Sequence, residues 1–364
     1  MNPEITTDIL NLLHVPGIGP QRVRTLLSYY KDTRSIWDES ETGLCQIEGI
    51  NISIARSILD FTDFDFGKRQ VEIAQKNNCN IVSSFDNHYP ELLKRIYDPP
   101  VLLFTKGNGL KKEQDCIAIV GTRNMTEYGR RVTSDLSSSL SRSGLIIVSG
   151  LARGVDTIAH NETLIADGKT IAVLGCGLDR VYPSENRKLY SEIEDRGTLV
   201  SEFPFGTKPD AVNFPQRNRI ISGLSHAVIV VEAGNKSGAM LTALNAIDQN
   251  RDVYAVPGRI YDDKSIGTNR LIRHGAIPVQ NAEEIVTILQ PRLFKPNQPK
   301  QERINLELNP MQAKIVAQLQ NDAVHIDQLA KILNIEITKL LSELLQLELI
   351  GAVRQLAGKM FIAN

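Results

Sequence analysis

The sequence lacks long apolar runs, cysteine pairs and a basic start, and each absence excludes a class of protein. Its clean apolar runs are short, such as residues 227–231, whereas a membrane-spanning helix needs ~20 apolar residues. Glu4 and Asp8 stand where a secretory signal peptide would be basic. The four cysteines are scattered and form no C-x-x-C pair, which argues against a zinc site or a redox motif. We therefore expect a cytoplasmic protein with reduced thiols, no membrane segment and no bound metal.

The sequence also lacks an excess of either charge. Lysine and arginine total 41, aspartate and glutamate total 42, and the formal net charge is −1. Bulk electrostatics therefore do not indicate nucleic-acid binding, and any site for an anion has to be local. With 364 residues, of which 42% are hydrophobic, the composition is that of a globular protein with roughly two or three domains.

Residues 1–64 are expected to form a small helical domain. Two stretches in it read alike, LHVPGIG at 13–19 and IEGI at 47–50, and an apolar-periodic helix follows each of them. Both resemble helix-hairpin-helix (SAM-like) units, in which a glycine-rich turn at the start of a helix exposes N–H groups that can hold a phosphate. Asn51 stands in the second copy where Gly19 stands in the first. A helical packing module without a ligand is the alternative, and both interpretations stay open.

Residues 65–290 are expected to form the central domain. A connecting region comes first, with a helix through residues 71–74 and a short strand at 81–82. From residue 116 onward, short strands that are apolar at consecutive positions alternate with helical stretches, which is typical of a parallel sheet covered on both faces. The fold class is therefore α/β, with an extended Rossmann-like, doubly wound parallel sheet. The expected strands are residues 117–120, 145–148, 170–174, 198–201, 227–231 and 252–256.

Residues 291–303 read as a linker and residues 304–364 as a separate domain. The linker contains three prolines and four basic residues, a composition typical of a semi-extended tether. The segment after it has the order helix, helix, helix, β-hairpin, with the hairpin turn expected at residues 357–358. This order resembles a winged helix.

The third helix of this last domain argues against duplex recognition. It carries Glu336, Glu343 and Glu348 beside a single Lys339, and insertion into a major groove would set these acids against phosphates. We therefore prefer a partner-binding or regulatory role for the domain. Its expected core residues at helical spacing are Leu340, Leu341, Leu344 and Leu345.

Four loops that follow expected strands are rich in glycine, and three of them carry a cation. In a parallel sheet, ligands bind outside the C-terminal ends of the strands, where helix N-termini present free N–H groups. Glycine lets the backbone approach a ligand closely, and the arginine fork matches phosphate oxygens. The pattern therefore indicates a phosphate-bearing ligand. The loops are GTR at 121–123, SGLARG at 149–154, GCG at 175–177 and AGNKSG at 233–238.

The sequence gives little support for several classes of enzyme. Residues 175–180 begin like a dinucleotide fingerprint, but Arg180 stands at the third glycine position. No G-x-x-x-x-G-K-[ST] segment occurs, and Ser149 lies in no G-x-S-x-G motif. Asp156 and His160 are four residues apart on an expected helix and allow an acid/base pair. We favour a structural role for them, with Asp156 stabilising a helix N-terminus and His160 packed beside it.

The segment 214–225 is the densest in cations around the expected site, and Pro215 can open a helix there. Arg217 and Arg219 are two residues apart, so they point to roughly opposite faces of that helix. Only one of them can line the crevice, and a structural ion pair is expected for the other. Phe214 is either a core residue or a stacking surface for a base, since an aromatic face in a cationic groove holds single strands without sequence preference.

Five motifs, in order and in register over residues 115–280, resemble the DNA-processing protein A (DprA/Smf) family. The resemblance implies a bacterial, cytoplasmic protein with an extended Rossmann fold that binds and protects single-stranded DNA and loads RecA recombinase onto it during natural transformation. It also implies a homodimer, no catalytic activity and no cofactor. The motifs are IVGTR at 119–123, SGLARGVD at 149–156 with His160, LGCGLD at 174–179 with Tyr182-Pro183, the segment 214–225, and the segment from SG at 237–238 to RDVYAVPG at 251–258.

The resemblance also implies which residues touch DNA. The triplet 121–123 matches the family's phosphate-binding triplet, and Phe214 matches its aromatic residue beside the DNA. Two lysines that are frequent in the family are absent, and Lys208 and Arg187 lie close enough in sequence to substitute for them. The expected DNA-binding residues are Gly121, Thr122, Arg123, Ser149, Gly150, Arg153, Arg187, Lys208, Phe214, Arg217, Asn218, Lys236, Ser237 and Gly238.

The sequence leaves three hypotheses for the function of the protein. The leading hypothesis is a non-enzymatic single-strand binder and recombination mediator that contacts RecA through the Rossmann-like domain. The second is an enzyme acting on nucleoside monophosphates, with Glu232 at a strand end as its acid. The third is a duplex-binding transcription factor, which depends on the terminal domains alone.

Overall fold

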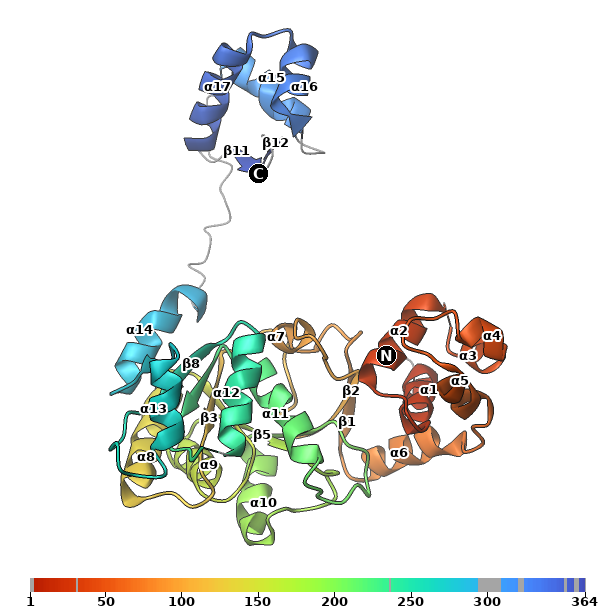
Figure 1. Cartoon of the computed structure of the whole chain (residues 1–364), viewed down its shortest axis with the longest axis vertical. Coiled ribbons are helices and arrows are strands. Elements are labelled where there is room, and N and C mark those ends of the chain that lie inside the picture. Colours follow the sequence, from red (N-terminus) through yellow and green to blue (C-terminus); the bar gives the residue numbers. More distant parts are fainter. Residues whose placement is uncertain are drawn as a thin grey trace. The chain divides into compact units, whose positions relative to one another are not determined.

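The computed structural model describes residues 3–30, 32–235, 237–293, 309–319, 324–349, 352–356 and 360–363. The chain divides into two compact units, Met1–Phe294 and Lys295–Asn364 (Figure 1). The predicted boundary after residue 64 falls inside the first unit. All four cysteines are free. Within the described residues, no helix combines the length and the apolarity that crossing a membrane requires.

Six helices begin the first unit, and they contain both predicted hairpins. Gly17 (φ +82°) and Gly49 (φ +83°) occupy the left-handed region at the two turns, where glycine is favoured. Arg22 donates to the carbonyls of both glycines, at 2.7 and 2.8 Å, and so joins the turns. Asn51 is a helix cap that accepts from the Ile54 amide at 3.0 Å. The helices are α1 (Pro3–His14), α2 (Pro20–Tyr29), α3 (Arg34–Trp37), α4 (Glu41–Leu44), α5 (Ile52–Leu59) and α6 (Asp65–Lys76).

A nine-stranded sheet forms the centre of the first unit. Its order is β1-β2-β6-β5-β4-β3-β7-β8-β9. The pairs β1–β2 and β2–β6 are antiparallel, and all other neighbours are parallel. All six strands expected after residue 116 are present. The strands are β1 (Asn80–Ser83), β2 (Leu102–Gly107), β3 (Cys116–Val120), β4 (Ile146–Ser149), β5 (Thr170–Leu174), β6 (Thr198–Ser201), β7 (Ala227–Val230), β8 (Asp252–Ala255) and β9 (Ile277–Pro278).

The description of residues 65–110 as a connecting region was incomplete. Its predicted helix and first strand are present as α6 and β1, but β2 was missed, and β2 joins the sheet between β1 and β6. Residues 101–104 are all buried, so this apolar run was the signal. Pro99 and Pro100 stand directly before this run, and such a pair is typical of a turn rather than of a strand.

Helices cover both faces of the sheet, as the apolar runs predict. On β3, Ala118 and Val120 belong to one apolar core together with α11 and α12. Ile117 and Ile119 belong to a second core on the other face, together with α8, α9 and α14. Successive residues of β3 are therefore buried on opposite faces of the sheet, as expected for a doubly wound sheet that helices cover on both faces. The helices are α7 (Glu91–Lys94), α8 (Glu127–Arg142), α9 (Val155–Ile165), α10 (Arg187–Arg196), α11 (Asn213–Gly223), α12 (Gly238–Asp248), α13 (Ile266–Arg273) and α14 (Ala282–Leu293), with a short 3-10 turn at Ser184–Asn186.

Two helix ends differ from the expectation. The helix α11 begins at Asn213, so Pro215 is its third residue rather than its first. A proline is tolerated there because the first-turn N–H groups have no partner within the helix. The helix α14 continues to Leu293 and takes in residues 291–293, which the composition assigned to the linker.

The second unit has the predicted order of three helices and a β-hairpin. A short strand that was not predicted, β10, pairs with β12 and completes a three-stranded antiparallel sheet in the order β10-β12-β11. The predicted turn at residues 357–358 lies outside the described residues. The elements are α15 (Pro310–Leu319), β10 (Val324–His325), α16 (Ile326–Leu333), α17 (Ile337–Leu349), β11 (Val353–Leu356) and β12 (Met360–Ala363).

The core of this unit corrects one prediction. Leu340 and Leu344 are buried as expected, but Leu341 is 48% exposed and Leu345 is 58% exposed. Each residue turns a helix by about 100°, which moves positions 341 and 345 out of the stripe that faces the core. Leu347 is the third core residue of α17.

Candidate functional site

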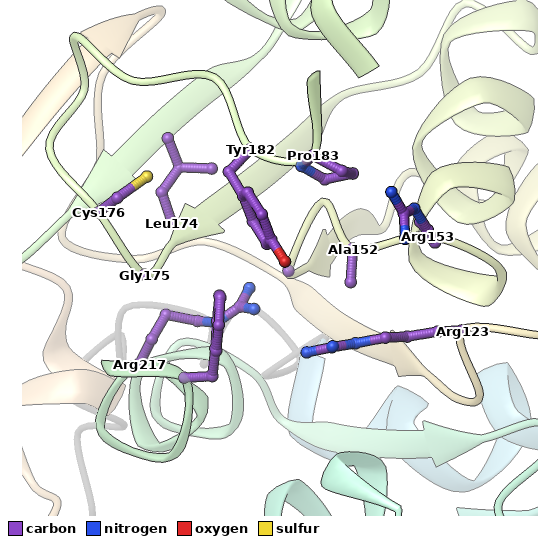
Figure 2. A pocket seen from close by; sticks show the side chains of 11 residues that line it. Arg123, Ala152, Arg153, Leu174, Gly175, Cys176, Tyr182, Pro183 and Arg217 are labelled. Carbon is purple, nitrogen blue, oxygen red and sulfur yellow. The ribbon is translucent and has the colours of Figure 1, made fainter. Parts of the chain in front are cut away.

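The glycine-rich loops after β3, β4, β5 and β7 line two adjoining pockets at the carboxyl edge of the sheet. The larger one has a volume of about 540 Å³. Arg123, Ala152, Phe214 and Arg217 line both pockets. The larger pocket also has Val120, Gly121, Thr122, Asp156, Asn218, Ile221, Gly234, Ser237, Gly238, Ala239 and Thr242. The smaller one also has Gly150, Arg153, Leu174, Gly175, Cys176, Tyr182 and Pro183 (Figure 2).

Two arginines and two aromatic rings meet in this site. Figure 2 shows the side chains of Arg123 and Arg217 extending from opposite sides toward the space below Tyr182. The guanidinium carbons of Arg123 and Arg217 lie 5.4 and 6.0 Å from the centroid of the Phe214 ring. The rings of Tyr182 and Phe214 lie 5.7 Å apart at a tilt of 31°. Phe214 is half-buried and lines both pockets, so it belongs to the site and not to the core alone.

Arg217 is a buried cation that lines both pockets. Arg217 is only 4% exposed, and this burial lowers the pKa of its guanidinium to about 10. The nearby charge of Asp156 acts against this lowering of the pKa, and the charge of Arg123 adds to it. One of its terminal nitrogens donates to the Val173 carbonyl at 2.5 Å. In the described part of the chain, no carboxylate lies within ion-pair distance of Arg217, and its Nε has no partner. Burying a charge is costly unless it is paired, so the position favours an anionic ligand.

Arg219 forms the structural ion pair that the helical spacing predicted for one of the two arginines. Its Nη2 contacts both carboxylate oxygens of Glu202 at 2.7 Å, and its Nε lies 3.7 Å from Asp98. Arg219 is therefore held in an ion pair, while Arg217 lines the crevice. The same Asp98 accepts from Arg24 of α2 at 3.0 Å, which connects the helical segment to α11.

The N-terminus of α12 forms one wall of the larger pocket. Ser237 caps this helix by accepting from the Ala239 amide, at 3.3 Å. The Asn218 side chain donates to the Gly238 carbonyl, also at 3.3 Å, and so joins α11 to α12 across the pocket floor. A helix N-terminus carries a partial positive charge, which adds to the positive charge of the two arginines.

Asp156 and His160 are structural, as we favoured. The Asp156 carboxylate accepts from the amides of Gly150 and Ala152, at 3.1 and 3.3 Å, and burial raises its pKa. His160 is fully buried, and its Nδ1 lies 2.6 Å from the Thr170 hydroxyl. Burial lowers the pKa of His160 to about 3, and Arg217 acts in the same direction. His160 is therefore neutral at physiological pH, and Asp156 fastens the loop after β4.

Four of the expected DNA-binding residues that the structure describes do not contribute a free side chain to the pockets. The Ser149 hydroxyl is fully buried and donates to the Ile119 carbonyl at 2.7 Å. Arg153 lines the smaller pocket but pairs with Glu185. Arg187 and Lys208 are exposed and line neither pocket, and Lys236 lies outside the described residues. The remaining nine expected residues line one or both pockets.

The sequence argument missed Tyr182 and Pro183, which close the smaller pocket. The motif that contains them was noted, but their loop is long: β5 ends at Leu174 and α10 begins only at Arg187. Nothing in the spacing shows that this loop lies against Phe214. The same gap removes the dinucleotide interpretation, because a fingerprint requires the glycines to open a helix directly after the strand.

Glu232, the acid named for the enzymatic alternative, is closed off from the pockets. It is 2% exposed, and its carboxylate accepts from the Thr126 amide at 2.9 Å and from the Thr126 hydroxyl. It lines neither pocket. Its contacts fasten the N-terminus of α8.

A doubly wound sheet with a crevice at its carboxyl edge, flanked by two arginines and two aromatic rings, defines this chain as a Rossmann-like protein. Residues 80–290 match the family model described as DNA recombination-mediator protein A. Residues 299–359 match the DprA winged helix domain, and residues 9–62 match a SAM-like helix-hairpin-helix tandem. The chain belongs to the DNA recombination-mediator protein A (DprA/Smf) family, as its motifs predicted.

Three relatives show how far the similarity extends. Protein Smf of Synechocystis is 34% identical over 94% of this chain and 95% of its own length. The crystal structure of DprA from Streptococcus pneumoniae is 34% identical, with a TM-score of 0.67 over 79% of this chain and 97% of that one. DNA processing protein A from Helicobacter pylori, described for its single-stranded DNA binding mode, is 32% identical, with a TM-score of 0.53 over 59% of this chain and 96% of that one.

Proposed function

We propose that this protein binds single-stranded DNA along the carboxyl edge of its sheet, without sequence preference and without catalysing a reaction. The observation that carries the proposal is Arg217, a buried cation without a carboxylate partner in the described residues, which lies with Arg123 beside the Phe214 ring. Phosphates satisfy the cations, and bases stack on the rings. The single-stranded DNA binding described for the Helicobacter pylori relative supports the same ligand here.

The non-enzymatic part of the proposal is supported by the state of the groups nearest the pockets. Asp156 and Glu232 are engaged by backbone amides, and His160 is neutral and buried. Burial raises the pKa of the Cys176 thiol to about 11, so this thiol is not a nucleophile at neutral pH. We infer that the site binds and does not cleave.

The finer role we propose is that of a cytoplasmic recombination mediator in natural transformation. The protein protects incoming single strands and loads RecA onto them, acting as a homodimer. The family description supports mediation. An apolar face on α12 and α13, with Leu241, Leu244 and Ile247 each about half exposed, supports contact with another protein chain. We assign the second copy of this chain to that face and test it by oligomeric state in the Discussion.

For the second unit we propose partner binding and not duplex recognition. The helix α17 presents Leu341 and Leu345 to solvent, and Glu348, three residues beyond Leu345, is also exposed. Apolar and acidic side chains do not fit a phosphate backbone. A duplex that competes with single strands for the full chain at physiological salt would contradict this assignment.

Fluorescence anisotropy of a labelled single-stranded oligonucleotide tests the DNA proposal. Wild type and Arg123→Ala are compared at several salt concentrations, with unlabelled duplex as competitor. With about three to five phosphates neutralised, the log–log salt slope should be roughly −2 to −3.5. Binding should be lost in the variant and resist duplex competition. A slope near zero, or equal binding by the variant, would place the ligand elsewhere.

Two further assays test the finer role. A panel of nucleoside monophosphates should show no turnover, and saturable turnover that Glu232→Gln abolishes would replace the proposal with the enzymatic alternative. RecA loading is followed as the DNA-dependent ATP hydrolysis of RecA at limiting RecA concentration. We expect wild type to raise this rate and Arg123→Ala not to raise it.

A further inference from the structure

The loop between β8 and α13, two elements that Figure 1 labels, presents two large side chains to solvent. In this loop, residues 257–265, Ile260 is 76% exposed and Tyr261 is 95% exposed. Exposed aromatic side chains next to a cationic groove are a recurrent means of holding single-stranded nucleic acid. The question is whether this loop lies on the path of a strand bound in the two pockets.

The base of the loop is fixed. Asn269 makes two hydrogen bonds to Gly258, donating to its carbonyl at 3.0 Å and accepting from its amide at 3.2 Å. Asp262 accepts from the Lys264 amide through its side chain, at 2.9 Å, and from the Ser265 amide through its carbonyl, also at 2.9 Å. The tip that carries Tyr261 is therefore presented by an ordered turn.

The loop adjoins the larger pocket. The Ala233 amide donates to the Lys264 carbonyl at 2.7 Å. Gly234 lines that pocket, and a Cβ built on it would lie 3.5 Å from the Asp263 carbonyl. On the other side, the hydroxyl of the half-exposed Tyr128 donates to the Pro257 carbonyl at 3.0 Å. The loop thus lies next to the site on the side of β8, although none of its residues lines either pocket.

The strand order gives the separation between the strand ends from which the two aromatic residues follow. Tyr182 follows β5 and Tyr261 follows β8, and the sheet order between them is β5-β4-β3-β7-β8. Four strand spacings amount to ~19 Å. A few nucleotides of an extended strand span this distance while crossing Arg123 and the N-terminus of α12.

We propose that Tyr261 is a second stacking surface, on which a base of the same bound single strand lies several nucleotides away from the base at Phe214 and Tyr182. This inference rests on the proposed function and extends it from a pocket to a track along the sheet edge. Asp262 and Asp263 follow the tyrosine directly in the chain and repel phosphates, so the contact is made through the base face and not through the backbone.

Oligonucleotide length distinguishes a track from a single pocket. The thymidine dinucleotide, which is too short to span ~19 Å, and a thymidine oligomer of about 16 nucleotides, the upper end of the usual site size, are titrated against wild type and Tyr261→Ala. Loss of one stacked base should weaken binding of the longer oligomer at least about fivefold and leave the shorter one unchanged. The salt slope should stay the same, because no phosphate contact is removed.

Matched variants control the test. Tyr261→Phe keeps the ring and should bind like wild type. Ile165→Ala removes an apolar side chain that is 76% exposed at the end of α9, shortly before β5 begins and so at the amino edge of the sheet, and it should also bind like wild type. Tyr261→Trp adds an indole whose emission the longer oligomer should quench and the shorter one should not, over the background of Trp37, the single tryptophan.

The outcomes separate this inference from the proposed function. If Tyr261→Ala binds the longer oligomer as wild type does while Arg123→Ala does not bind, the track is wrong and the pocket stands. Equal weakening at both lengths would move Tyr261 into the primary site and also overturn the track. If wild type binds neither oligomer, the proposed function itself fails.

Discussion

The guanidinium of Arg217 occupies the space beside Gly150 that a Cβ at position 150 would need. The absence of a side chain at Gly150 is therefore what admits the buried arginine to the smaller pocket. Gly150 is therefore needed for the packing of Arg217, in addition to its place beside the candidate ligand site.

Gly150→Ala should displace Arg217 and weaken single-strand binding about tenfold. Overpacking of this kind costs ~1–3 kcal/mol of unfolding free energy, which urea denaturation measures beside the binding titration. Gly238→Ala is the stability control, because a Cβ there meets no atom within 4 Å, and its unfolding free energy should equal that of wild type. Wild-type affinity and stability in Gly150→Ala would show that Arg217 does not need this space.

The two neighbouring arginines of α11 should respond in opposite ways to substitution. Arg219→Gln leaves Glu202 buried without its partner, so the unfolding free energy should fall by about 3 kcal/mol. Arg217→Gln removes a cation that has no carboxylate partner in the described residues, so it should cost less stability and abolish single-strand binding. Chemical denaturation and anisotropy on both variants check this. Equal losses of stability would contradict the assignment of the two roles.

His160 predicts a specific pH dependence of stability. Its pKa is lowered from 6.5 to about 3 in the folded protein. Between these values the unfolded chain binds a proton that the folded chain does not, so the unfolding free energy falls as the pH decreases below about 6.5. From this group alone, the loss between pH 7 and pH 5 is about 2 kcal/mol.

Denaturation of wild type and His160→Gln at pH 7 and pH 5 measures this contribution. Burial raises the pKa of both Asp156 and Glu202, which acts in the opposite sense, and the comparison cancels their effect. The wild-type protein should lose about 2 kcal/mol more than the variant. An equal loss in both proteins would mean that His160 is protonated in the folded state.

The apolar face of α12 predicts an effect on oligomeric state. Leu244→Glu places a charge in the middle of this face and should convert a dimer into a monomer in sedimentation experiments. Ile165→Glu is the control, because Ile165 is 76% exposed on α9 and its replacement should leave the dimer intact. A Leu244→Glu protein that remains dimeric would place the interface on another surface.

Much of the fold was predictable because its signals are local. The strands β3 to β8 are buried on both faces, so their sequences are apolar at consecutive positions. Gly17 and Gly49 mark hairpin turns because the turns require positive φ. The opposite roles of Arg217 and Arg219 follow from helical spacing, which is also local.

The tertiary structure alone decided which side chains are available to a ligand. Ser149 and Lys208 were both expected to bind DNA from the sequence. In the structure the Ser149 hydroxyl is buried and donates to the Ile119 carbonyl on the neighbouring strand β3, and the Lys208 side chain lines neither pocket. Leu341 and Leu345 belong to the helical pattern of α17, but they fall outside its core-facing stripe. Such outcomes depend on neighbours that are distant in the chain.

The sequence by itself determined the family, the parallel sheet and the loops that carry the site, because backbone conformation and burial follow from nearby residues. Only the folded chain decided that Tyr182 lies against Phe214 and that Arg217 is buried without a carboxylate partner among the described residues. The reason is physical, because ion pairing, desolvation and ring stacking depend on which atoms lie within a few ångströms of a group. These atoms come from segments that are far apart in the sequence, and only the folded chain brings them together.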